Sequence, residues 1–107
     1  MRTRRVVGLD HAGAELFGRP LRHAVLAVLL GARGRSLSVT EILAALGRGG
    51  RSVDAAYPAK ALADALAYEV RLGRVVRTER GRYALRRLSR GTEYRVLSRF
   101  GAPFAGL

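Results

Sequence analysis

The chain has 107 residues, which suits one small domain with a single hydrophobic core. Its 20 basic and 8 acidic residues give a net charge of +12, and a charge of this sign and size favours a polyanionic partner such as nucleic acid. The chain has no cysteine and only two histidines, which excludes disulfide bonds, thiolate metal sites and cysteine nucleophiles and argues against an ordinary zinc site.

Residues 1–19 are predicted to form a basic N-terminal arm with poor order. Arg2, Arg4 and Arg5 in this arm are candidates for a phosphate or minor-groove contact, and a solvated terminus without contacts is the alternative. The longest apolar run of the chain, residues 24–32, is too short to span a bilayer. We therefore expect a cytoplasmic protein with no membrane segment.

A first helix is predicted over residues 20–33. Pro20 suits the first turn of a helix, and Gly34 favours a stop. Between them, apolar residues recur at the spacing of one helical face: Leu21, Val25, Val28, Leu29 and Ala32. His23 is expected on the surface of this helix.

A short strand at residues 36–38 and a second helix at residues 39–46 are predicted next. Ser38 and Glu41 have the spacing of a capping box, in which each side chain bonds the backbone N–H of the other. Gly47 is expected to close the helix. The apolar face of the helix is supplied by Ile42, Leu43 and Leu46.

The glycine-rich residues 47–53 are predicted to form a loop that carries Arg48 and Arg51. A third helix is predicted over residues 58–72, begun by a proline and ended by Gly73. Because a helix turns by about 100° per residue, its apolar ridge and its exposed face lie on opposite sides. The ridge is predicted to contain Leu62, Leu66 and Val70. The exposed face is predicted to contain Tyr57, Lys60, Asp64, Tyr68 and Arg71.

A β-hairpin with Gly81 in its turn is predicted over residues 75–85. Side chains alternate between the two faces of a hairpin, so Arg80 and Arg82 near its tip are not both expected to be buried. These two side chains are therefore candidates for contact with a polyanion.

A basic C-terminal extension is predicted at residues 86–107, with a short helix from Thr92 to Phe100 that is capped by Thr92. Residues 71–99 contain ten arginines against two glutamates, so this stretch carries +8 of the net charge. An ordinary solvated surface mixes both signs, so the surplus favours nucleic-acid contact. The apolar residues of 92–104 are expected to pack on the first helix or to pair two subunits in a homodimer.

The order helix, short strand, helix, loop, helix, glycine and hairpin resembles that of winged helix-turn-helix domains. The similarity is carried by residues 38–42 (SVTEI) and residues 73–85 (GRVVRTERGRYAL), and it covers residues 20–85. The chain is most similar to small arginine-rich winged-helix proteins of bacteria and more loosely to the globular domains of linker histones. The resemblance implies an α+β fold with three helices, a two- or three-stranded antiparallel wing and a short C-terminal helix.

One position departs from the winged-helix pattern. These domains often carry an apolar residue four positions before the glycine that ends the third helix, and this chain has Glu69 there. Either Glu69 is half-buried and paired with an arginine, or the third helix is rotated from the predicted orientation.

The resemblance implies that helix 58–72 enters the major groove of DNA and that the hairpin at residues 75–85 contacts the backbone or the minor groove. Lys60 is a candidate for contact with guanine or phosphate, and Asp64 for the amino group of cytosine, although a helix that faces solvent or phosphate is the favoured alternative. Tyr57 and Tyr68 are candidates for stacking on bases, although packing against the hairpin is favoured. The arginines assigned to the nucleic-acid surface are Arg48, Arg51, Arg71, Arg77, Arg80, Arg82, Arg86 and Arg87.

The predicted function is that of a double-stranded DNA-binding protein, either a transcriptional regulator or a nucleoid-associated protein. RNA binding or ribosome association is one alternative, because the same charge serves RNA. A winged-helix protein-interaction module is the other, using the alanine-rich third helix and the apolar tail. The sequence has no P-loop, metal-ligand or nucleophile motif, so no enzyme activity, metal or cofactor is expected.

Overall fold

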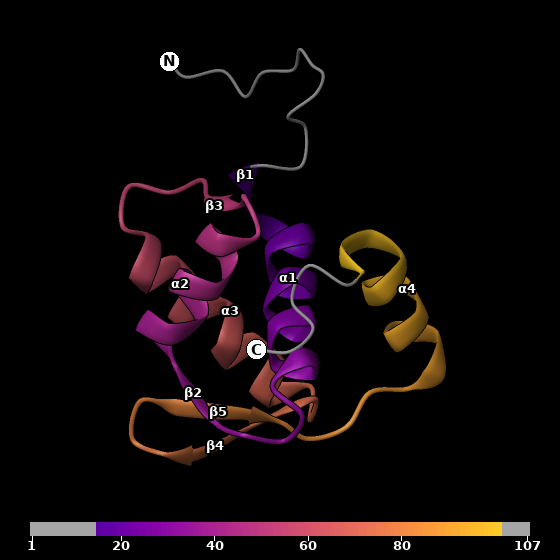
Figure 1. The fold of residues 1–107 in the computed structure, drawn as a ribbon. Coiled ribbons are helices and arrows are strands. Elements are labelled where there is room, and N and C mark those ends of the chain that lie inside the picture. Colours follow the sequence, from indigo (N-terminus) through magenta and orange to yellow (C-terminus); the bar gives the residue numbers. More distant parts are fainter. Residues whose placement is uncertain (1–14, 102–107) are drawn as a thin grey trace.

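The computed structural model describes residues 15–101 and has an α+β architecture, as the sequence predicts. Four helices are present in this part of the chain: α1 (Gly18–Gly31), α2 (Val39–Arg48), α3 (Pro58–Arg71) and α4 (Arg90–Phe100). The strands are β1 (Glu15–Leu16), β2 (Leu37–Ser38), β3 (Ser52–Val53), β4 (Val75–Glu79) and β5 (Arg82–Leu85). Figure 1 shows α1 at the centre, with α2 and α3 on one side of it and α4 on the other.

The strands form two small sheets. One is antiparallel and three-stranded in the order β2-β5-β4, so the hairpin predicted at residues 75–85 is confirmed. The glycine in the turn of this hairpin has a φ of 74°, which residues with a Cβ rarely adopt. The other sheet pairs β1 with β3 in parallel, Glu15 opposite Ser52. The prediction that residues 47–53 form only a loop is therefore wrong at its C-terminal end, and the predicted arm contributes a strand.

The helix boundaries follow local sequence signals closely. The capping box of α2 is confirmed, because Glu41 Oε1 accepts from Ser38 N at 2.8 Å and Ser38 Oγ accepts from Glu41 N at 3.1 Å. α2 continues past the predicted stop at Gly47 and ends at Arg48. α1 begins two residues earlier than predicted, before its proline.

The cap of α4 differs from the prediction. Ser89, not Thr92, is the N-cap residue, and its hydroxyl accepts from Thr92 N at 3.2 Å. Thr92 is buried one turn further along. The two hydroxyl residues are three positions apart, and the upstream one captures the free N–H groups because the helix begins at Arg90.

The core forms around α1, which is covered on two sides. All five apolar residues predicted for the inner face of this helix are buried. His23 is also buried, so the prediction that it lies on the helix surface is wrong. α4 packs against α1. The other helices and β4 contribute Ile42, Leu46, Leu62, Leu66, Val75, Val96 and Phe100 to the same cluster.

The apolar ridge of α3 contains a carboxylate. Leu62 and Leu66 are buried as predicted, but Val70 is exposed and Glu69 has no exposed surface. Glu69 Oε1 accepts from Arg74 Nε at 2.6 Å, its Oε2 accepts from Arg74 Nη2 at 3.2 Å, and Arg22 Nε lies 3.6 Å from Oε2. The expected pairing with an arginine is therefore confirmed, but Glu69 is fully buried and not half-buried. The exposed Val70 shows that the helix is also rotated from the predicted orientation.

Candidate nucleic-acid interface

The outer face of α3 has the exposure that the sequence predicts, but two of its charged groups neutralise each other. The side chains of Lys60 and Asp64 are 73% and 69% exposed, and Lys60 Nζ lies 3.3 Å from Asp64 Oδ2. This pair is one helical turn apart, and such exposed pairs are weak enough to open on binding. The middle of the helix face is therefore close to neutral as it stands.

The C-terminal end of the same face carries a stack of one aromatic ring and two arginines. The Arg22 guanidinium lies 4.2 Å from the centre of the Tyr68 ring, and the Arg71 guanidinium lies 5.5 Å from it. Tyr57, at the other end of α3, is 74% exposed, so the prediction that it packs against the hairpin is wrong. Arg71 therefore lies beside the Tyr68 ring at this end of the helix face.

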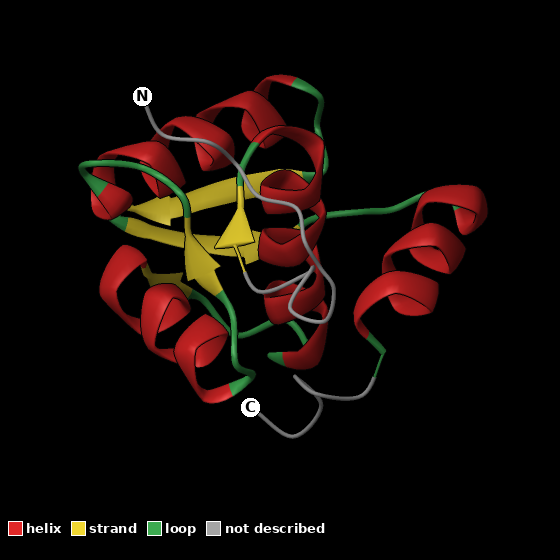
Figure 2. Cartoon of the chain, turned by 90° about the horizontal axis from the view of Figure 1, so that it is seen from above, coloured by secondary structure: helices red, strands yellow, loops and turns green. Residues whose placement is uncertain are grey.

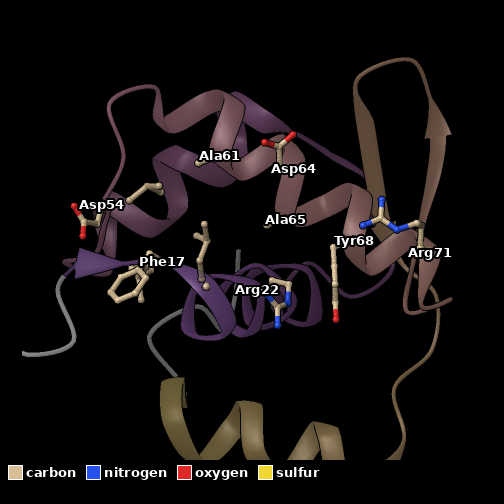
Figure 3. A pocket seen from close by; sticks show the side chains of 12 residues that line it. Phe17, Arg22, Asp54, Ala61, Asp64, Ala65, Tyr68 and Arg71 are labelled. Atoms are coloured by element: carbon tan, nitrogen blue, oxygen red, sulfur yellow. The ribbon is translucent and has the colours of Figure 1, made fainter.

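A groove of about 400 Å³ lies between the start of α1 and α3. Its lining includes Leu21 and Ala65, which are buried, and the partly exposed rings of Phe17 and Tyr68. Arg22 of α1 and Arg71 of α3 both line this groove, and Figure 3 shows Arg71 at the C-terminal end of α3. The outer face of α3 is therefore bordered by a hollow on the α1 side and by the hairpin at its C-terminal end.

The hairpin and the segment after it carry exposed arginines without acidic partners. Arg77 lies on β4, Arg80 lies in the turn, and Arg86 and Arg87 follow β5; all four are exposed. Within residues 15–101 none of them forms an ion pair. Ion-paired acids in this part of the chain include the exposed Glu41 of α2 and, on α3, the exposed Asp64 and the buried Glu69. The single acid of the hairpin, Glu79, is outnumbered by these arginines, so the hairpin and the segment after it keep a net positive charge.

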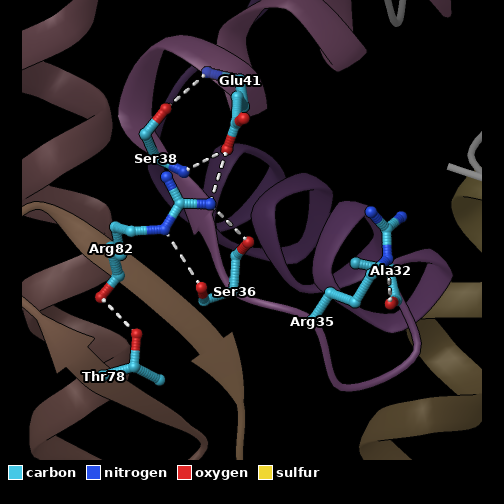
Figure 4. A network of polar contacts seen from close by, with 7 residues as sticks. All are labelled: Ala32, Arg35, Ser36, Ser38, Glu41, Thr78 and Arg82. Atoms are coloured by element: carbon cyan, nitrogen blue, oxygen red, sulfur yellow. Dashed lines mark hydrogen bonds and ion pairs between the residues drawn. The ribbon is translucent and has the colours of Figure 1, made fainter.

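Arg82 differs from the other arginines of the hairpin, because its guanidinium is bonded to the protein. Nε donates to Ser36 Oγ at 3.1 Å, and Nη2 donates to the Ser36 carbonyl at 2.9 Å and to Glu41 Oε1 at 3.2 Å (Figure 4). The side chain is 35% exposed. The predicted contact of Arg82 with nucleic acid would have to compete with these three bonds.

Two groups of this region have a perturbed pKa. Hydrogen bonding from the Ser38 backbone N–H lowers the pKa of Glu41 from its usual value, and the charge of Arg82 lowers it further. Burial lowers the pKa of His23, and the charges of Arg99, Arg74 and Arg19 add to this effect against the opposing carboxylate of Glu69.

The remaining arginines assigned to the surface by sequence have separate positions. Arg48 is exposed at the end of α2. The guanidinium of Arg51 lies 5.0 Å from the centre of the Phe100 ring, so it connects the segment before β3 to the end of α4. The three arginines of the N-terminal arm, Arg2, Arg4 and Arg5, lie outside the described residues.

The structure assigns roles to two arginines that sequence reasoning did not single out. Arg22 contacts both the Tyr68 ring and Glu69, and Arg74 makes the bidentate bond to Glu69. The signal for Arg74 was present in the sequence, because a carboxylate on an apolar helical ridge requires a nearby cation. Arg22 is distant in sequence from α3, and no local pattern indicates its position.

Comparison of the chain with protein-family models, with curated protein sequences and with solved structures finds no match. In the described part of the chain, no group of three or more His, Asp or Glu side chains is arranged to hold a metal ion. No helix in residues 15–101 has both the length and the apolar composition needed to cross a membrane. The functional conclusion therefore depends on the geometry of the surface described above.

Proposed function

We propose that this protein binds double-stranded DNA through α3 and the arginines of the β4–β5 hairpin and of the segment that follows it. The observation that carries the proposal is the set of exposed arginines that form no ion pair within residues 15–101: Arg77, Arg80, Arg86 and Arg87. Arginine binds phosphate in bidentate geometry, and each phosphate that it neutralises releases condensed counterions.

The topology supports assignment to the winged-helix class. The order α1, β2, α2, α3, β4, β5 and the three-stranded antiparallel sheet are compatible with the layout of that class. On this assignment α3 lies in the major groove and the β4–β5 hairpin, from here on called the wing, contacts the backbone or the minor groove. Residues 20–85 then form the DNA-binding domain.

The charge distribution favours binding that is dominated by phosphate contacts. The wing and the segment after it carry the unpaired arginines, whereas the middle of α3 carries the mutually neutralised Lys60 and Asp64. Arg71 is the residue of α3 best placed for base readout, because its guanidinium lies beside the Tyr68 ring and arginine recognises guanine by two hydrogen bonds. Broad affinity for duplex DNA with a modest sequence preference follows, and this suits a nucleoid-associated protein better than a stringent regulator.

The sheet favours duplex over single-stranded RNA. Proteins that read single-stranded RNA commonly stack bases on aromatic side chains of an exposed sheet. The exposed residues of β4 are aliphatic, charged or polar, and Tyr83 of β5 packs against the core. The sheet therefore offers no aromatic platform for bases.

A titration of labelled random duplex DNA by fluorescence anisotropy at several salt concentrations tests the proposal. If about five to eight phosphates are neutralised, log K is expected to fall against log salt with a slope of about −4.5 to −7. A structured RNA hairpin added as competitor is expected to displace the duplex less effectively than unlabelled DNA does. An affinity that does not respond to salt, or the absence of binding at low salt, contradicts the proposal and favours a protein-interaction module. More effective displacement by the RNA hairpin favours RNA binding.

A further inference from the structure

The Arg82 side chain connects the wing to a segment more than 40 positions earlier in the sequence. From the start of β5 it reaches Ser36, in the loop before β2, and Glu41, in the first turn of α2. Three hydrogen bonds of 2.9–3.2 Å form this connection, and Figure 4 shows all of them converging on one guanidinium. A bidentate, charge-assisted arrangement of this kind fixes orientation as well as distance.

The connection is made at the turn end of the wing, not at its base. Arg82 follows the turn directly, and β2 pairs only with Arg82 and Tyr83 of the wing. The carboxylate oxygen of Glu41 that accepts from Arg82 also accepts from Ser38 N in the capping box. The wing and the N-terminus of α2 therefore share one carboxylate oxygen.

We infer that Arg82 is a positioning residue that holds the wing against α2, and that the neighbouring Arg77 and Arg80 supply the wing's phosphate contacts. This inference rests on the proposed DNA-binding function. A hairpin fixed only at its base would have to be ordered when it binds, and that ordering would reduce the affinity. The three bonds of Arg82 add to the backbone pairing of β2 with Arg82 and Tyr83 in ordering this end of the wing in the free protein.

Substitutions that keep the charge separate positioning from phosphate contact. Lysine retains the positive charge of arginine but cannot reproduce its planar fork of donors. We expect Arg82→Lys to weaken duplex binding by about 2- to 12-fold, equivalent to the net contribution of one hydrogen bond. Arg80→Lys is the matched comparison: it keeps the point charge that a phosphate contact needs, so its loss of affinity is expected to be smaller than that of Arg82→Lys. Equal behaviour of the two variants would overturn the inference.

The salt dependence provides a second discriminating measurement. Removal of a phosphate contact by Arg80→Gln is expected to make the slope of log K against log salt shallower by about 0.9. Arg82→Gln is expected to lower the affinity and leave that slope unchanged, because no counterion release is lost. A slope that becomes shallower by the same amount in Arg82→Gln would show that Arg82 contacts phosphate directly.

Neutralising Glu41, the acid that holds Arg82, is expected to weaken DNA binding, although charge alone predicts stronger binding. Loss of a carboxylate near DNA ordinarily strengthens binding, and Glu79→Gln on the wing is expected to do so. Glu41→Gln keeps a side chain that suits a capping box but loses the charge that holds Arg82, and we expect it to weaken binding. Stronger binding by Glu41→Gln would mean that a released Arg82 contributes more to binding than a held one, and would overturn the inference.

A measurement without DNA separates failure of this inference from failure of the proposed function. Amide hydrogen exchange in the free protein is expected to be faster over residues 76–83 in Arg82→Lys and unchanged in Arg80→Lys, at a temperature where both are fully folded. Unchanged exchange in Arg82→Lys overturns the positioning role even if DNA is bound. Absence of DNA binding by the unmodified protein overturns the proposed function, and the exchange measurement still decides whether Arg82 orders the wing.

Discussion

Glu69 shows how a single carboxylate organises the junction between α3 and the wing. It is fully buried, and the Arg74 side chain that grips it lies between the end of α3 and the start of β4. The backbone of Arg74 also accepts from Arg86 N at 2.8 Å, after β5. The Glu69 carboxylate therefore fixes Arg74, which lies just before β4 and whose carbonyl holds the backbone just after β5.

Glu69→Ala is expected to lower the free energy of unfolding by about 3 kcal/mol, because it leaves two partly buried guanidinium groups without their anion. Asp64→Ala is the control, since it removes a carboxylate from an exposed pair on the same helix and is expected to cost at most about 1 kcal/mol. Urea denaturation measures both. A loss in Glu69→Ala no larger than that of the control would contradict the structural role of the buried ion pair.

His23 is expected to make stability depend on pH. Its folded-state pKa is lowered, chiefly by burial, so the unfolded chain takes up a proton first as the pH falls below the ordinary value of 6.5. The stability present above that pH is therefore lost between 6.5 and the lower folded-state pKa. Glu41 acts in a separate window, because its pKa is lowered from 4.5 and its contribution is lost only at more acidic pH.

Thermal unfolding from about pH 8 to about pH 5 checks the effect of His23. His23→Gln is expected to flatten the decline in the unfolding midpoint below pH 6.5. The control is His11→Gln, which changes the other histidine of the chain. If the decline persists in His23→Gln and disappears in His11→Gln, the assignment to His23 is wrong.

At the scale of elements, α4 is an integral part of the core. Val96 and Phe100 are buried against the cluster that surrounds α1, while Tyr94 and Leu97 of the same helix are exposed. The sequence allowed these apolar residues to pack on the first helix or to pair two subunits. The intramolecular packing of Val96 and Phe100 is confirmed, and the homodimer through residues 92–104 stays a prediction that rests on fewer exposed apolar side chains.

Phe100→Ala is expected to destabilise the protein by about 3–5 kcal/mol, because it removes a buried aromatic ring and leaves a cavity. Tyr94→Ala removes an aromatic ring from the solvent-facing side of the same helix and is expected to change stability by about 0.5 kcal/mol or less. Denaturation by urea compares the two variants. A similar loss in both would indicate that α4 contributes through its helical structure and not through the core contact.

The elements that the sequence predicts well are those with local signals. The capping box of α2 and the glycine turn of the hairpin are encoded within a few residues, and both occur where predicted. The β1–β3 pair was missed because two-residue strands have no measurable periodicity and their pairing joins positions far apart in the chain. The ridge of α3 was misplaced by one position because Val70 is apolar, whereas burial of Glu69 depends on two arginines outside the helix.

The candidate site was harder to predict than the fold. Sequence can count the arginines of the wing, but it cannot show that Arg82 bonds Ser36, which is 46 positions away, or that Lys60 and Asp64 neutralise each other. The exposure of Arg77 and Arg80, in contrast, follows from their place in a short hairpin. The sequence therefore predicts how much charge a segment carries. Which charged side chains are free to bind a partner can be read only from the structure.

At the scale of the whole molecule, α1 lies between a side built of two helices and a side built of one. α2 and α3 lie on one side of it and α4 on the other, and Figure 2 shows the same arrangement from above. Three ion-paired carboxylates lie on α2 and α3: Glu41, Asp64 and Glu69. The wing and the segment leading to α4 therefore carry a positive field that attracts a polyanion at a distance and weakens as salt is added.

The irregular register of the wing has a consequence for self-association. β4 is an edge strand, and its pairing with β5 shifts between Arg77 and Glu79. Regular, uncharged edge strands can pair with edges of other copies and start aggregation, whereas a bulge and a charged side chain prevent such pairing. The register shift and the charged side chains of Arg77 and Glu79 therefore disfavour edge-to-edge pairing of β4 with other copies of the chain.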